Sequence, residues 1–89
     1  MVDSLLEVDV AHANESWEEA RRKIDAVLDE CLLKNFKGMK IIHGRGSRAG
    51  HTCIIAKHAV HYMKKLSMEH DGKLVQDKHT NGAHIIYFN

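Results

Sequence analysis

The sequence predicts an α/β fold, a two-layer sandwich in which a four-stranded mixed sheet carries two helices on one face. Two segments repeat apolar residues at the spacing of an amphipathic helix, and four short segments have the apolar alternation or β-branched content of strands. Their order along the chain is β-α-β-α-β-β. The 89 residues suit one domain spanning residues 1–89, with room for a modest core.

The first strand is expected at residues 6–10. Leu6, Val8 and Val10 alternate there with Glu7 and Asp9, which is the period of a strand with one buried face. Asp9 is therefore expected on the face opposite the core or at the edge of the sheet.

The first helix is expected to begin after Ser16. The sequence Ser16-Trp17-Glu18-Glu19 is a capping box, in which the Ser16 hydroxyl accepts from the Glu19 amide and Glu19 reaches back. About five turns follow, ending near Asn35, a residue that tolerates the left-handed conformation. The inward stripe consists of residues at helical spacing: Trp17, Ala20, Ile24, Val27, Leu28, Cys31 and Leu32.

A second strand and a second helix flank a glycine loop. Met39, Ile41 and Ile42 form a short buried strand that breaks at residue 43, and a helical pattern resumes near Thr52 and ends near Ser67. The inward residues of this helix recur at helical spacing: Ile55, Ala59, Tyr62, Met63 and Leu66.

The last two strands are expected to form a hairpin. A turn at residues 70–73 precedes a strand at 74–78, and Asn81-Gly82 is a strong hairpin signal. Residues 83–88 make the final strand, while helical crossovers relate the first three strands.

The charges are divided along the chain. The net charge is +1, but residues 1–30 hold nine acids and three bases, a net −6, whereas residues 31–89 hold ten bases and three acids, a net +7. Such a division indicates that the second half faces an anionic partner; the alternative is that opposite charges interleave once the chain folds.

Several classes of protein are disfavoured. No apolar run approaches the roughly 20 residues that span a bilayer, and the N-terminus lacks the pattern of a signal peptide, so a cytoplasmic protein without a membrane partner is expected. Cys31 and Cys53 lie in helical patterns, which favours buried free thiols over a disulfide. His58 and His61 share a helix face, but no carboxylate or cysteine completes a zinc site, so no residue is assigned to a metal.

The loop after the second strand has the design of an anion-binding site. Its glycines allow backbone N–H groups to approach a ligand, and the unpaired N–H groups of the next helical turn favour negative charge. Arg45 and Arg48 add side-chain donors, as do His43 and His51. The alternative is an ordinary strand-to-helix connection whose glycines permit a tight turn.

Four segments match one family pattern, and with them the chain resembles the small MutS-related (Smr) domain over nearly its whole length. The segments are Val8-Asp9-Val10, Ser16 to Ala20, Ile41 to Ser47, and Gly82 to Phe88. The third is the specific one, since it matches the family's isoleucine-isoleucine-histidine-glycine-lysine/arginine-glycine-serine loop. The resemblance implies a sandwich similar to the C-terminal domain of bacterial translation initiation factor three. It also implies a DNA or RNA partner, and a domain that occurs alone or within a larger protein.

The first strand departs from the family pattern, which ends aspartate-leucine-histidine-glycine. Ala11 occupies the place of the histidine, and His12 follows one residue later, so strand alternation directs His12 to the other face unless the chain bulges. Two functions follow from the resemblance. The first is an endonuclease that nicks branched or single-stranded nucleic acid with the His43 to Gly46 loop, and the alternative is a nucleic-acid-binding module that does not cleave.

The resemblance and the loop together nominate site residues. The catalytic candidates are Asp9, His12 and His43, with Asp9 orienting His43, acting as a base, or holding a divalent cation such as Mg²⁺ or Mn²⁺. For His43 the alternative is a structural role, in which its ring binds the loop backbone and holds the turn. The nucleic-acid-binding candidates are Gly44, Arg45, Gly46, Ser47, Arg48 and Lys40.

Overall fold

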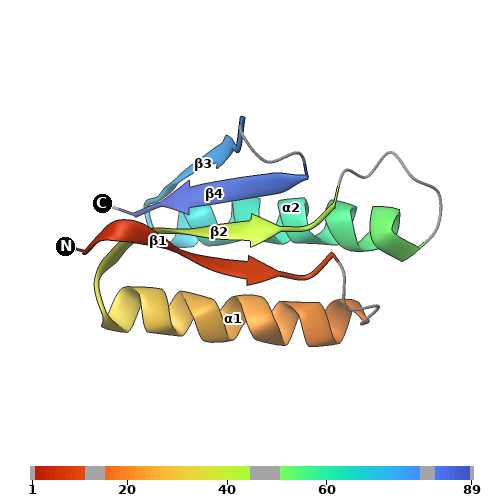
Figure 1. Cartoon of the computed structure of the whole chain (residues 1–89), viewed down its shortest axis with the longest axis horizontal. Helices are drawn as coiled ribbons and strands as arrows, with labels where there is room; N and C mark the ends of the chain where they lie inside the picture. Colours follow the sequence, from red (N-terminus) through yellow and green to blue (C-terminus); the bar gives the residue numbers. More distant parts are fainter. Residues whose placement is uncertain (1, 12–15, 45–50, 79–81, 89) are drawn as a thin grey trace.

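The computed structural model describes residues 2–11, 16–44, 51–78 and 82–88, and it confirms the predicted fold and order of elements. The elements are β1 (Val2–Asp9), α1 (Trp17–Leu33), β2 (Phe36–Ile42), α2 (His51–Glu69), β3 (Lys73–Gln76) and β4 (Ala83–Tyr87). The strands lie in the order β1-β2-β4-β3, with β1 parallel to β2 and the other neighbours antiparallel. Both helices pack on the same face of this mixed sheet (Figure 1).

Local sequence signals fix both ends of α1. The Glu19 amide donates to the Ser16 hydroxyl at 3.2 Å, and the Ser16 amide donates to the Glu19 carboxylate at 3.3 Å, so the predicted capping box is present. At the other end Asn35 has φ 59°, the left-handed conformation that ends many helices.

The core fills the space between the helices and one face of the sheet. Alternate strand residues, among them Val8, Met39, Ile41 and Ile86, meet the apolar stripes of the two helices. Each such aliphatic side chain contributes about 1.5–3 kcal/mol on full burial. Cys31 belongs to this core as a buried free thiol, as predicted, and burial raises the pKa of its thiol.

Several strands differ in their bounds from the sequence pattern, and β3 covers Lys73–Gln76 rather than residues 74–78. β1 starts at Val2 rather than Leu6, because parallel pairing with β2 extends to Phe36 and an irregularity between Val2 and Leu5 breaks the alternation. β2 starts at Phe36 rather than Met39, with Gly38 inside it. A Cβ atom on Gly38 would lie 2.4 Å from the Ile86 carbonyl oxygen, so the close approach of β4 requires glycine here.

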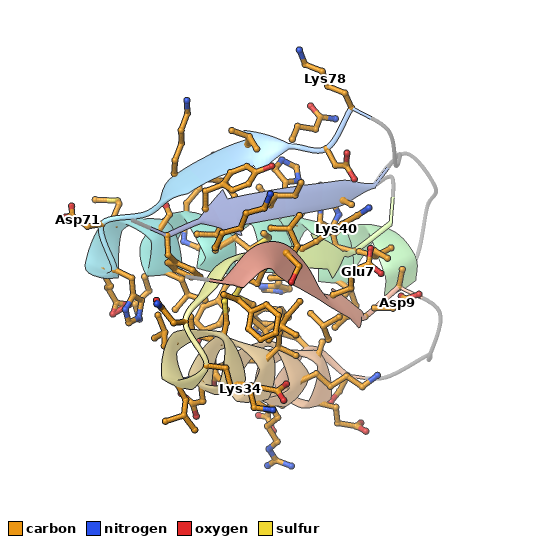
Figure 2. All side chains as sticks on the ribbon, turned by 60° about the vertical axis from the view of Figure 1, so that its left-hand side comes forward. Glu7, Asp9, Lys34, Lys40, Asp71 and Lys78 are labelled. Carbon is orange, nitrogen blue, oxygen red and sulfur yellow. The ribbon has the colours of Figure 1, made fainter. Side chains whose placement is uncertain are left out.

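The face of the sheet opposite the helices carries charged side chains in its centre. Lys40 of β2 lies 2.7 Å from the Asp77 carboxylate and 3.5 Å from that of Glu7, which is next to it on β1 (Figure 2). We call this surface the open face. In the part of the chain that the structure describes, no helix is long and apolar enough to cross a membrane.

Candidate nucleic-acid interface

One end of the sheet brings together three of the residues that the sequence nominates, namely Asp9, His43 and Gly44. β1 and β2 are parallel and finish there, and β4 begins there (Figure 1). The Val10 amide extends the ladder by donating to the Ile42 carbonyl at 2.9 Å. We call this end the loop edge and define it by Asp9, His43, Gly44 and Gly82. Open α/β sheets bind ligands outside the carboxyl ends of their strands, which makes the loop edge the candidate site.

The start of the glycine loop is anchored to the β4 side of this edge. The backbone amides of His43 and Gly44 both donate to the Gly82 carbonyl, at 2.8 and 3.0 Å. Gly44 has φ 92° and Gly82 has φ 78°, conformations that side chains with a Cβ adopt only at a cost. The backbone conformation of the loop edge therefore favours glycine at both positions.

The side chain of His43 points from the loop edge to the helix-facing side of the sheet, and 5% of the residue's surface is exposed. Its Nδ1 is 2.7 Å from the Gly44 carbonyl oxygen, and its Nε2 is 2.7 Å from Nδ1 of His84. Burial lowers the pKa of His43, which favours the neutral ring. Both ring nitrogens of His43 thus lie within hydrogen-bond distance of protein atoms. The contact with Gly44 corresponds to the structural role, in which the ring binds the loop backbone.

His84 of β4 is a member of the site that sequence reasoning missed. It pairs with Ile41, two residues before His43, so both rings share a face. The ring centroids are 4.9 Å apart. Burial, and then the nearby Lys64 ammonium, lower the pKa of His84. Alternation within residues 83–88 gives its face, but the pairing that brings it to His43 depends on the β2–β4 register.

Asp9 reaches the loop edge from the other face of the sheet. It pairs with Ile42, the residue before His43, so its exposed carboxylate belongs to the open face while the His43 ring lies among the helices. Its Oδ1 accepts from the Ala11 amide at 2.8 Å, which holds the carboxylate at the end of the strand. Figure 2 shows Asp9 at the end of β1, beyond Glu7.

Lys40 is engaged in the centre of the open face. Only 14% of its side chain is exposed, and the hydrogen bond to Asp77 is the main cause that raises its pKa. The Lys40 ammonium therefore forms ion pairs with the Asp77 and Glu7 carboxylates on the open face. Lys40 is not one of the residues of the loop edge.

The remaining nominated residues lie outside the residues that the structure describes: His12, Arg45, Gly46, Ser47 and Arg48. Among the described residues, no group of three or more histidine, cysteine, aspartate or glutamate side chains is arranged to hold a metal ion. Asp9 is the described residue nominated for a cation, and a single carboxylate gives only one of the several oxygen ligands that Mg²⁺ takes.

Comparison with protein families matches the Smr domain over residues 11–88, nearly the whole chain. The matched part includes His43, Gly44 and His84, and it begins two residues after Asp9. No curated protein and no solved structure shows significant similarity. Smr domains are nucleic-acid-binding, nuclease-related domains. The match, together with the four-stranded mixed sheet and its two helices, shows that this chain belongs to the Smr domain family.

Proposed function

We propose that this chain binds the sugar-phosphate backbone of DNA or RNA at the loop edge. The observation that carries the proposal is the anchoring of the glycine loop, whose first two residues are bound to Gly82 at the carboxyl ends of two parallel strands. Because the start of the loop is already held in place, its backbone loses less conformational entropy when its N–H groups bind phosphate. Family membership supports nucleic acid as the anion.

The distribution of charge supports the same surface. Arg45 and Arg48 belong to the loop, and α2, which follows it, exposes Lys57, Lys64 and Lys65. α1 instead exposes more acidic than basic side chains: Glu18, Glu19, Asp29 and Glu30 against Arg21, Arg22 and Lys23. We therefore propose that nucleic acid lies over the loop edge and α2, away from the acidic surface of α1.

Fluorescence anisotropy with labelled single-stranded DNA, duplex DNA and RNA tests this proposal. The logarithm of the association constant should fall linearly with the logarithm of salt concentration, by about 0.9 per phosphate neutralised on duplex DNA. The double variant Arg45→Glu/Arg48→Glu should bind at least about tenfold more weakly. The matched control is Arg21→Glu/Arg22→Glu on α1, which makes the same change of charge. Equal losses in both variants, or affinity that does not depend on salt, would refute the proposal.

Nicking of the bound strand is the second candidate function, and the position of Asp9 favours it. Its carboxylate is exposed at the loop edge and held by the Ala11 amide, at the point where a bound backbone would pass. We propose Asp9 as the base that takes a proton from the water attacking phosphorus, or as a ligand of Mg²⁺ or Mn²⁺. His12 would give a proton to the oxygen that leaves as the old P–O bond breaks. His43, with both ring nitrogens engaged, holds the loop that binds the phosphate.

Cleavage is tested by incubating the chain with supercoiled plasmid and with end-labelled RNA, with and without Mg²⁺ or Mn²⁺. Asp9→Asn and His12→Ala should each lower the nicking rate by at least about a hundredfold, while binding stays within about twofold. Retained binding by the unaltered chain without nicking under any of these conditions would eliminate the enzyme and leave the binding function.

A further inference from the structure

We propose that His43 and His84 form a proton-sharing pair that holds the start of the glycine loop, accepts one proton on His84 Nε2, and comes apart when it takes a second. This inference rests on the proposed function in one respect, namely that the loop edge is the surface that binds nucleic acid. The pair itself follows from the positions of four polar atoms and from which of them can donate a hydrogen.

The direction of each hydrogen bond follows from the Gly44 carbonyl. A carbonyl oxygen only accepts, so Nδ1 of His43, 2.7 Å away, carries the hydrogen. In a neutral ring Nε2 of His43 is then the acceptor, and Nδ1 of His84, 2.7 Å from it, must donate. A neutral His84 therefore has its lone pair on Nε2, an atom with no hydrogen bond among the residues that the structure describes.

A first proton fits this arrangement without disturbing it. Placed on Nε2 of His84, it leaves both hydrogen bonds of the pair as they are, and the positive ring becomes a stronger donor toward His43. The charged group acting on His84 from α2 is Lys64, which opposes this protonation, and the neighbour on β3 is the uncharged Gln76. Burial of the ring opposes the charge as well, so His84 takes up this proton below the ordinary pKa of histidine.

A second proton does not fit. It would have to bind Nε2 of His43, the atom that accepts from His84, so two N–H groups would face each other across 2.7 Å. Two positive rings with centroids 4.9 Å apart, one of them buried, would also repel. The hydrogen bond between the two rings is then lost, and the repulsion acts on the His43 ring, whose Nδ1 holds the Gly44 carbonyl.

Long-range ¹H–¹⁵N NMR correlations of the labelled chain test the pair without any nucleic acid. Near neutral pH both rings should be Nδ1–H tautomers, whereas free histidine favours the Nε2–H tautomer. As the pH is lowered, Nε2 of His84 should take up a proton while His43 stays neutral. An Nε2–H tautomer at either residue, or independent protonation of the two rings at the ordinary pH for histidine, would refute the pair.

Two variants test whether the pair holds the loop. His84→Leu removes the donor to His43, whereas His84→Asn offers an amide N–H near the position of Nδ1; His61→Leu, at an exposed site on α2, is the control. Affinity for labelled single-stranded DNA should fall about tenfold in His84→Leu and stay within about twofold in the other two. Circular dichroism of each variant confirms that it is folded.

The outcomes separate this inference from the proposed function. If the unaltered chain binds no nucleic acid, the proposed function fails, and the tautomers still decide whether the pair exists. Where the chain binds, equal affinities of His84→Leu and the unaltered chain would refute the holding role. Equal losses in His84→Leu and His84→Asn would refute the donor role of His84 specifically.

Discussion

Asp9 and His43 lie at the ends of neighbouring parallel strands, on opposite faces of the sheet. Asp9 pairs with Ile42, and the next residue along β2 is His43, whose ring turns toward the helices. The two side chains share the loop edge but differ in surroundings, because one carboxylate is exposed and one imidazole is enclosed. Substitutions at the two positions should therefore have different consequences.

His43→Ala should destabilise the fold, whereas Asp9→Asn should not. Removing the ring leaves the Gly44 carbonyl and Nδ1 of His84 without the partner they have now, which costs about 1–3 kcal/mol in the free energy of unfolding. Asp9→Asn keeps an acceptor for the Ala11 amide and should change it by less than about 0.5 kcal/mol. Urea unfolding followed by circular dichroism measures both, and equal effects would contradict the placement of the two residues.

Stability should fall in mild acid because of the His43–His84 pair. The pKa of His43 and that of His84 are lowered in the folded chain, chiefly by burial, so below the ordinary pKa of 6.5 the unfolded chain binds more protons than the folded one. This contribution is fully present above pH 6.5 and is lost progressively as the pH falls below it. Urea unfolding at about pH 7.5 and about pH 5.5 measures the loss. The loss should shrink in His84→Asn and persist in His61→Leu; an unchanged loss in His84→Asn would contradict it.

The sequence predicts more of the fold than of the site. Alternation in residues 6–10, the capping box at Ser16 and the Asn81-Gly82 signal are local patterns, and each predicts its element without knowledge of the rest of the chain. The early starts of β1 and β2 were missed because pairing between strands, rather than alternation, creates them. Gly38 lies inside a strand because β4 passes close to it, which no local pattern reveals.

The site depends on relationships between strands. His43 stands out in the sequence through its glycine loop, but its enclosure and its bond to His84 follow from the β2–β4 register. The opposite faces of Asp9 and His43 follow from the β1–β2 register. Candidates chosen by local motif thus identify the loop edge, while the registers decide which side chains meet there.

Gly44 should be intolerant of substitution for reasons of backbone conformation. Its φ of 92° favours glycine, so Gly44→Ala should cost about 1–2 kcal/mol in the free energy of unfolding. The matched control is Asn35→Gly, at φ 59°, where glycine also fits and the change should be within about 0.5 kcal/mol. Thermal unfolding compares the two variants, and a neutral Gly44→Ala would contradict the left-handed turn at the start of the loop.

Lys40→Met should weaken the fold more than it weakens nucleic-acid binding. The Lys40 ammonium lies 2.7 Å from the Asp77 carboxylate, whose side chain is 7% exposed, so losing it leaves a largely enclosed negative charge without its lysine. The expected cost is about 1–3 kcal/mol in the free energy of unfolding. Because this lysine balances carboxylates on the open face, affinity for labelled DNA should stay within about twofold.

Lys40→Met/Asp77→Leu distinguishes the ion pair from the lysine's own packing. It removes both charges together, so it should recover most of the stability that Lys40→Met loses. The comparison with Arg45→Glu/Arg48→Glu, which should lose affinity at least about tenfold, separates the open face from the loop edge. A loss of DNA affinity in Lys40→Met as large as in the double arginine variant, with the protein still folded, would move the binding surface onto the open face.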